Sequence, residues 1–131
     1  MPDAPGQPPT NGQSASSGAT PTISTHVLDT ERGAPAAGIR VTLYRLDVGA
    51  APIRMTQALT DDDGRVRDLL GRPLAAGAYR LEFDVAGRGE DADGDAFFRR
   101  LAIDLSITDA GRSYHVPLLL APFSMTTYRG S

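Results

Sequence analysis

Apolar and polar residues alternate one by one along much of the chain after residue 22, a pattern typical of strands that bury one face. The clearest alternating runs are residues 39–43, 79–85, 101–107 and 114–120. Turn residues such as Asp63-Gly64 and Asp109-Ala110-Gly111 separate them. Several short strands with turns between them predict an all-β protein, an antiparallel sandwich or barrel.

One segment, residues 68–76, has enough length and the composition to hold a helix. Gly71 and Pro73 lie inside it, and both residues disfavour a helix interior. The fold therefore has at most one short helix.

The alternation also orients the only two histidines of the chain, His26 and His115. If Tyr114 and Val116 face the core, His115 points away from it, and the pattern of residues 23–27 turns His26 outward in the same way. The outer face that they share also carries apolar residues, namely Leu28, Pro117 and Leu119. An exposed histidine is most often simply solvated, but a partly apolar face is typical of one that another subunit covers.

Length and composition divide the chain into a tail and one domain. Residues 1–21 are rich in Pro, Gly, Ser, Thr and Gln, so they bury too little apolar surface to fold and predict a disordered tail. Residues 22–131 have the length of one domain. The tail lacks the apolar centre of a secretory signal, and no apolar segment is long enough to span a membrane, so we expect a cytoplasmic protein.

Charge and cysteine content exclude several kinds of function. The chain has no cysteine, which excludes disulfides and thiolate metal sites. The net charge is only −3, and arginines alternate with acidic residues, as in residues 80–84, so the sequence offers no basic surface for nucleic acid.

The sequence lacks the common motifs for metal and cofactor binding. The acidic segment 90–95 suggests a calcium loop. An EF-hand needs Gly at position six and Glu at position twelve, and counted from Asp91 these places hold Ala96 and Ala102. No phosphate-binding glycine loop, zinc-ligand spacing or Ser-His-Asp order is present. We therefore expect no metal and no cofactor.

Four segments carry a more specific signal. They are Ser-Thr-His-Val-Leu-Asp-Thr at 24–30, Gly-Ala-Pro-Ala-Ala-Gly at 33–38, Tyr-His-Val-Pro-Leu-Leu-Leu at 114–120 and Tyr-Arg-Gly-Ser at 128–131. Chain ends usually fray, so a polar motif at the terminus suggests that this end is tied down and used. Residues 23–131, with these motifs, resemble the 5-hydroxyisourate hydrolases, the enzyme branch of the transthyretin-like family.

The resemblance implies a transthyretin-like β-sandwich that hydrolyses 5-hydroxyisourate to 2-oxo-4-hydroxy-4-carboxy-5-ureidoimidazoline in urate degradation. It implies catalytic roles for His26, Arg65, His115 and Ser131, and substrate binding by His26, Arg65 and Tyr128. It also implies that the small-molecule substrate lies in a channel of a homotetramer, without a cofactor.

Arg65 is assigned by its place in the segment Thr60-Asp61-Asp62-Asp63-Gly64-Arg65, which matches a Thr-x-x-Asp-Gly-Arg segment of the family. Without the resemblance, the simpler interpretation would be a turn arginine that balances the charge of three neighbouring aspartates. Arg54 and Arg67 are close in sequence, but only Arg65 directly follows the Asp-Gly turn.

Two other functions stay open at this point. A transthyretin-type carrier of a hydrophobic small molecule would have the same fold, but we expect it to replace the polar groups and to lose the terminal motif. An interaction domain without a ligand would leave that motif unexplained. The chain also departs from the family at Ala121 and Met125, where serine and tyrosine are usual, and we expect Met125 to affect subunit packing.

Overall fold

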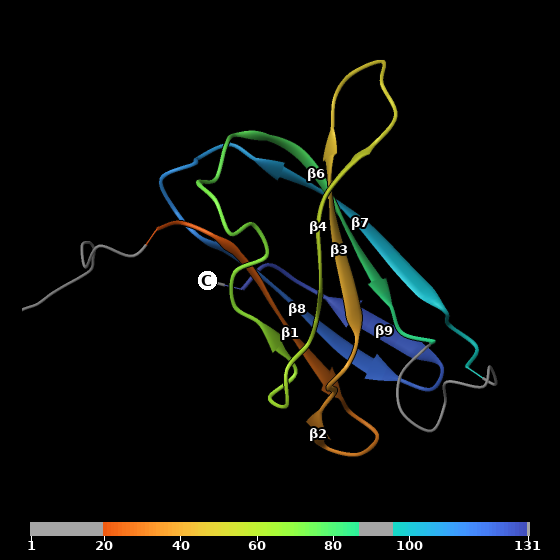
Figure 1. The fold of residues 1–131 in the computed structure, drawn as a ribbon. Coiled ribbons are helices and arrows are strands. Elements are labelled where there is room, and N and C mark those ends of the chain that lie inside the picture. Colours follow the sequence, from red (N-terminus) through yellow and green to blue (C-terminus); the bar gives the residue numbers. More distant parts are fainter. Residues whose placement is uncertain (1–19, 87–95, 131) are drawn as a thin grey trace, which may run out of the picture.

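The computed structural model describes residues 20–86 and 96–130, and all regular elements within them are strands (Figure 1). One sheet has the order β2-β1-β8-β9, with β5 also paired to β1, and the other has the order β4-β3-β6-β7. The strands of the first sheet are β1 (Ile23–Asp29), β2 (Ala34–Pro35), β5 (Arg65–Val66), β8 (Tyr114–Ala121) and β9 (Ser124–Thr127). Those of the second are β3 (Arg40–Leu46), β4 (Ile53–Leu59), β6 (Gly77–Asp84) and β7 (Arg100–Ile107).

The two sheets enclose one hydrophobic core, as the alternation predicts. Every second side chain of the central strands is buried between the sheets, because strand side chains alternate between faces. Fully buried residues come, among others, from β1 and β8 on one side and from β3 and β6 on the other: Ile23, Val27, Leu118 and Leu120, and Val41, Leu43, Leu81 and Phe83. The predicted β-sandwich is confirmed.

The central pair of the first sheet is parallel, whereas all other pairs are antiparallel. β1 runs beside β8 from the pair Ile23 and Tyr114 to the pair Asp29 and Leu120. The connection between these strands includes the entire second sheet, so no hairpin forces them into opposite directions. This parallel pair brings the first signature motif beside the third.

Residues 68–76 form a loop in place of the short helix that the sequence allowed. The Asp68 carboxylate accepts backbone N–H bonds from Leu70 and Gly71, both at 3.1 Å, and Gly71 has a φ of 62°. An aspartate that bonds its own following backbone favours a turn over a helix. The leucines of this loop, Leu69, Leu70 and Leu74, are buried against the core.

Some predictions fall outside the described residues. They are residues 1–19 of the predicted tail, the acidic segment 90–95 and Ser131. Within the described ranges, no helix is long and apolar enough to cross a membrane. In the same ranges, no group of three or more His, Asp and Glu side chains could hold a metal ion.

Candidate active site on the outer face of the first sheet

Strand register brings His26, Arg65 and His115 onto one face. His26 lies opposite Arg65 of β5 on one side and opposite Pro117 of β8 on the other. His115 lies two residues before Pro117, so its side chain shares the face of His26. Both histidines are half-buried and point away from the core, as the alternation predicts.

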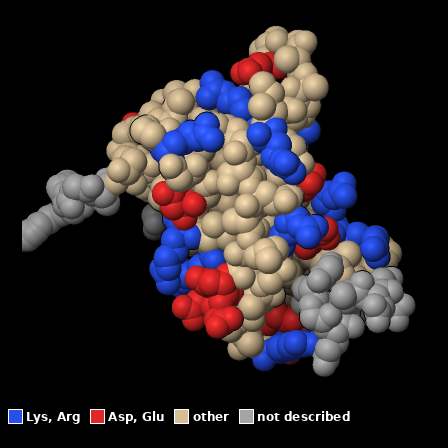
Figure 2. Space-filling model, viewed as in Figure 1, with Lys and Arg blue, Asp and Glu red and all other residues tan. Residues whose placement is uncertain are grey.

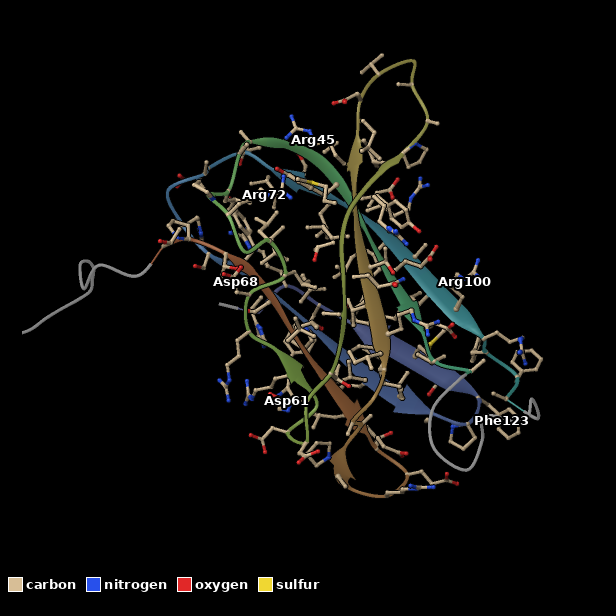
Figure 3. The ribbon with its side chains drawn as sticks, in the orientation of Figure 1. Arg45, Asp61, Asp68, Arg72, Arg100 and Phe123 are labelled. Atoms are coloured by element: carbon tan, nitrogen blue, oxygen red, sulfur yellow. The ribbon has the colours of Figure 1, made fainter. Side chains whose placement is uncertain are left out.

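The turn before β5 explains how Arg65 reaches this face. Asp61 lies in that turn (Figure 3), and its Oδ1 accepts backbone N–H bonds from Asp63 and Arg65, both at 2.9 Å. The bond from the Arg65 N–H is the main reason why the pKa of Asp61 lies below its ordinary value. The charged Asp61 carboxylate therefore stabilises the turn that places β5 beside β1.

Gly64 completes the same turn because no other residue fits there. Its φ is +77°, a conformation that favours glycine, and a Cβ would collide with the carbonyl oxygen of Val27. Its own carbonyl accepts the N–H of Val27 at 2.7 Å. The Asp-Gly-Arg segment thus joins β5 to β1 directly beside His26.

Of the three neighbouring arginines, Arg54 lies in the other sheet, on β4. Arg65 and Arg67 lie together at the histidine face. A hollow of about 150 Å³ is lined by Ser24, Arg65, Arg67 and His115, among others, and an adjoining open hollow of about 530 Å³ by His26, Arg65 and Arg67 among others. Arg65 therefore lies beside both histidines. Arg67, which was not among the residues predicted from the sequence, lines the same two hollows.

His115 has the most defined environment of the candidate residues. Its Nδ1 lies 2.9 Å from the Ser24 hydroxyl oxygen, and its carbonyl oxygen accepts the Gly130 N–H at 2.8 Å. Burial, then the positive charge of Arg65 and then His26, lower the pKa of His115 below that of an ordinary histidine. Its imidazole is therefore neutral near pH 7, the form that can accept a proton. The contact with Ser24 was not foreseen from the sequence.

The terminal segment is tied to the sheet at least as far as Gly130. The Thr127 hydroxyl donates to the Pro117 carbonyl at 2.8 Å, and the Arg129 guanidinium lies 5.2 Å from the centre of the Tyr114 ring. Tyr128 is 55% exposed and, with His115, lines a hollow of about 320 Å³ beside β7. The expected fixed terminus is confirmed up to Gly130.

One expectation about this face is wrong. Pro117 lies on the outer face, yet it is buried within the single chain, and its neighbours Leu28 and Leu119 are half-buried. Within the described residues, the apolar surface left open on this face is therefore smaller than the sequence suggested.

Comparison with known proteins agrees with this geometry. The sequence profile of the HIUase/Transthyretin family matches residues 23–130. The chain belongs to this family. A 5-hydroxyisourate hydrolase of Deinococcus radiodurans is 43% identical over 116 residues, which cover 85% of this chain and 97% of the relative.

Solved structures of the family repeat the fold. The Klebsiella pneumoniae 5-hydroxyisourate hydrolase superposes with a TM-score of 0.73 at 35% identity, covering 86% of this chain and all of the other. Sea bream transthyretin in complex with thyroxine has a TM-score of 0.74 at 24% identity, covering 82% of this chain and 93% of the other. At that identity the likeness to transthyretin shows a shared fold alone.

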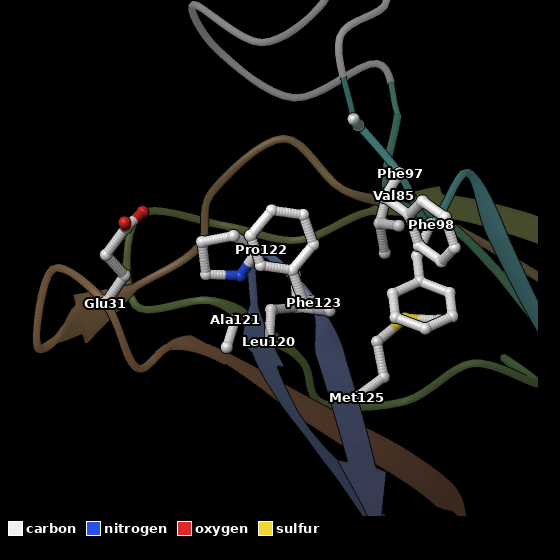
Figure 4. A pocket seen from close by; sticks show the side chains of 10 residues that line it. Glu31, Val85, Phe97, Phe98, Leu120, Ala121, Pro122, Phe123 and Met125 are labelled. Atoms are coloured by element: carbon white, nitrogen blue, oxygen red, sulfur yellow. The ribbon is translucent and has the colours of Figure 1, made fainter.

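The departures at Ala121 and Met125 from the usual residues of the family lie away from the histidines. Ala121 and Met125 help to line a hollow of about 170 Å³ at the β8–β9 turn, beside the aromatic residues Phe97, Phe98 and Phe123 (Figure 4). Met125 lies opposite Leu120 and packs against the core of its own chain. Among the described residues that line it, Glu31 alone is charged, so this part of the hollow has neither the histidines nor the arginines of the histidine face.

Proposed function

We propose that this protein hydrolyses 5-hydroxyisourate to 2-oxo-4-hydroxy-4-carboxy-5-ureidoimidazoline, a step in urate degradation. One observation carries the proposal: His26, Arg65 and His115 lie on one face of one sheet, in a chain of the HIUase/Transthyretin family. Relatives named for this activity share 37–43% of its residues over most of its length.

The reaction is the hydrolysis of a cyclic amide. Water adds to the ring carbonyl while a base removes its proton, and the carbonyl oxygen becomes an oxyanion. The C–N bond then breaks, the ring nitrogen is the leaving group and takes a proton, and the carbonyl carbon stays in the product as a carboxylate. Such a reaction needs a base for the water, donors for the oxyanion and an acid for the nitrogen.

The face offers side chains for each of these tasks. One neutral histidine takes the proton of water, and the low pKa of His115 keeps its imidazole in the neutral form for this purpose. The other histidine and the Arg65 guanidinium act as donors to the substrate. A planar guanidinium can give two parallel hydrogen bonds to a planar heterocycle, which a lysine could not.

The terminal segment completes the proposed site. Tyr128 lies beside the hollow that His115 lines and binds the substrate through its hydroxyl. Ser131 directly follows Gly130, whose backbone is bonded to His115, and we assign the Ser131 hydroxyl a catalytic role.

We also propose that the protein works as a homotetramer in the cytoplasm, a dimer of dimers with its sites in the channel between the dimers. The half-buried Leu28 and Leu119 beside the histidines support this arrangement, because another subunit would bury them further. In that arrangement the partner dimer closes the open side of the two arginine-lined hollows.

The direct test is to oxidise urate in situ with a urate oxidase, add the purified protein, and follow the ultraviolet absorbance of the 5-hydroxyisourate intermediate. We expect its decay to accelerate in proportion to protein concentration. Heat-inactivated protein and the double variant His26→Asn, His115→Asn serve as controls. An unchanged decay with folded wild-type protein would refute the proposed activity.

A carrier of a hydrophobic ligand is less well supported. The face has two histidines and two arginines around its hollows, whereas an apolar ligand favours an apolar lining. Tight binding of a thyroxine-like molecule in the absence of any hydrolysis would favour the carrier.

A further inference from the structure

His115 is held from two sides, and neither contact involves another proposed catalytic residue. On the β1 side, Ser24 lies directly opposite His115 in the parallel pair. On the other side, the backbone of Gly130 forms a bridge with His115. These two contacts together determine which edge of the imidazole ring can meet a substrate.

The Ser24 contact occupies one ring nitrogen. The Ser24 oxygen and His115 Nδ1 are 2.9 Å apart, and both residues are half-buried. A neutral imidazole has two distinct nitrogens, and the partner of one sets the protonation of the other. With Nδ1 engaged by Ser24, Nε2 is the nitrogen left to exchange a proton with water or substrate.

The Gly130 contact fixes the position of the ring itself. A Cβ at residue 130 would lie 2.8 Å from His115 Cδ2, which is too short for a carbon contact, and 3.3 Å from His115 Cβ and Cγ, which is tight. Gly130 does not adopt a positive φ, so the need for glycine here comes from space and not from backbone conformation. The imidazole therefore rests directly against the terminal backbone.

We propose that Ser24 and Gly130 are positioning residues for His115, which together direct its Nε2 toward the substrate. The inference rests on the proposed hydrolysis and deepens it, because it assigns proton exchange to one atom of the site. Catalytic groups lose much of their rate advantage when they are misplaced by about 1 Å, so positioning of this kind has a measurable effect on turnover.

The first experiment removes the hydroxyl. Ser24→Ala should lower kcat roughly two- to tenfold, the range for one neutral hydrogen bond, and leave KM nearly unchanged. Ser24→Thr keeps a hydroxyl on a residue suited to a strand and should recover most of the loss. Ser124→Ala, an exposed serine at the far end of the same face, is the matched control and should behave as wild type.

A spectroscopic readout separates positioning from a general loss of structure. Because the chain has two histidines, ring ¹⁵N spectra contain two imidazoles, and a His26→Asn variant assigns them. In Ser24→Ala the Nδ1 and Nε2 shifts of His115 should move, reporting a changed tautomer balance, while those of His26 should stay close to wild type.

The second experiment adds a methyl group where the ring rests. Gly130→Ala should displace the imidazole or the terminal segment and lower kcat roughly ten- to a hundredfold. Gly111→Ala is its control: Gly111 also lacks a positive φ, and its Cβ would meet only the Asp109 side-chain oxygen, at 3.2 Å. The control should retain full activity.

Each variant tests the role of one positioning residue. Ser24→Ala with wild-type kcat and unchanged His115 shifts, or Ser24→Thr as impaired as Ser24→Ala, would overturn the role of Ser24. Full activity of Gly130→Ala would overturn the role of Gly130. If wild-type protein proves inactive on 5-hydroxyisourate, the proposed function fails, whereas the ¹⁵N shifts still report whether Ser24 holds His115.

Discussion

The two outer faces of the sandwich differ in whether their arginines form ion pairs with carboxylates. On the second sheet, arginines form ion pairs with carboxylates of neighbouring strands: Arg40 with Asp84 at 3.6 Å, Arg80 with Asp104 at 2.7 Å, and Arg100 with Glu82 at 3.9 Å. On the first sheet, Arg65 makes no ion pair within the described ranges, and its strand neighbour is His26.

This difference indicates what each face does. Exposed ion pairs contribute little to stability, but they leave few charges free to attract a ligand. In the side of the molecule seen in Figure 2, basic and acidic side chains are interspersed in this way. On the first sheet, the Arg65 guanidinium lies beside two histidines and can instead donate to a substrate.

The largest expected effect comes from the histidines. His115→Asn and His26→Asn should each lower turnover by roughly 10²–10⁴, the effect of a positioned acid or base. Both side chains point away from the core, so circular dichroism should show intact strands. Near-wild-type turnover in either variant would remove that histidine from the mechanism and weaken the contrast between the faces.

Arg65→Gln should have the next largest effect, a loss of roughly 10²–10³ in kcat if the guanidinium stabilises the oxyanion. The substitution should also change the pH dependence of the rate. The positive charge of Arg65 helps to lower the pKa of His115, so its removal should raise that pKa. If neutral His115 is the active form, the acid limb of the rate profile should move to higher pH.

Two other arginines sharpen that test. Arg54→Gln, on the opposite sheet, should leave both rate and pH profile unchanged. Arg67→Gln removes a guanidinium that lines the same hollows but is 69% exposed, and we expect a smaller loss than for Arg65. An effect of Arg67→Gln equal to that of Arg65→Gln would mean that the Asp-Gly turn does not single out one arginine.

Deleting Tyr128 to Ser131 should cost roughly 10² in activity, because it removes Tyr128, Ser131 and the support that Gly130 gives His115. The strands all precede residue 128, so the sandwich should stay folded. Turnover, circular dichroism and solution mass on the truncated chain test this expectation. A fully active truncated protein would show that the terminus has no part in the site.

Much of this arrangement was accessible from the sequence, for identifiable reasons. The alternation located β1, β3, β6, β7 and β8 and turned both histidines outward. It missed β4, whose residues 53–59 do not alternate regularly and pair across a register shift between Leu43 and Tyr44. It also missed β9, a short polar strand that forms because it pairs with β8.

Within the site, the motifs identified residue types but not contacts. Ser24 and His115 are 91 positions apart, and their contact depends on the parallel register of β1 and β8. The close approach of Gly130 to the imidazole likewise depends on where the terminal segment crosses β8. Alternation gives the face of a side chain, whereas register gives its neighbour, and one sequence contains only the first.

The smallest effect is expected on the second sheet, where Asp104→Asn breaks the shortest of the ion pairs. The hydrogen bond from Arg80 is the main reason why the pKa of Asp104 lies below its ordinary value. Any stabilisation from this pair is therefore present above the ordinary pKa of an aspartate and is lost as the pH falls through the lowered pKa. Because both side chains are exposed, we expect no measurable change in turnover and almost none in the midpoint of thermal unfolding at neutral pH.

Thermal unfolding of wild type and Asp104→Asn at neutral and at strongly acidic pH, together with turnover at neutral pH, checks this expectation. A small difference that disappears in acid would agree with an exposed pair. If Asp104→Asn lowered turnover as much as Arg65→Gln does, the charged face would also serve the reaction, and the division between a solvated face and a binding face would be wrong.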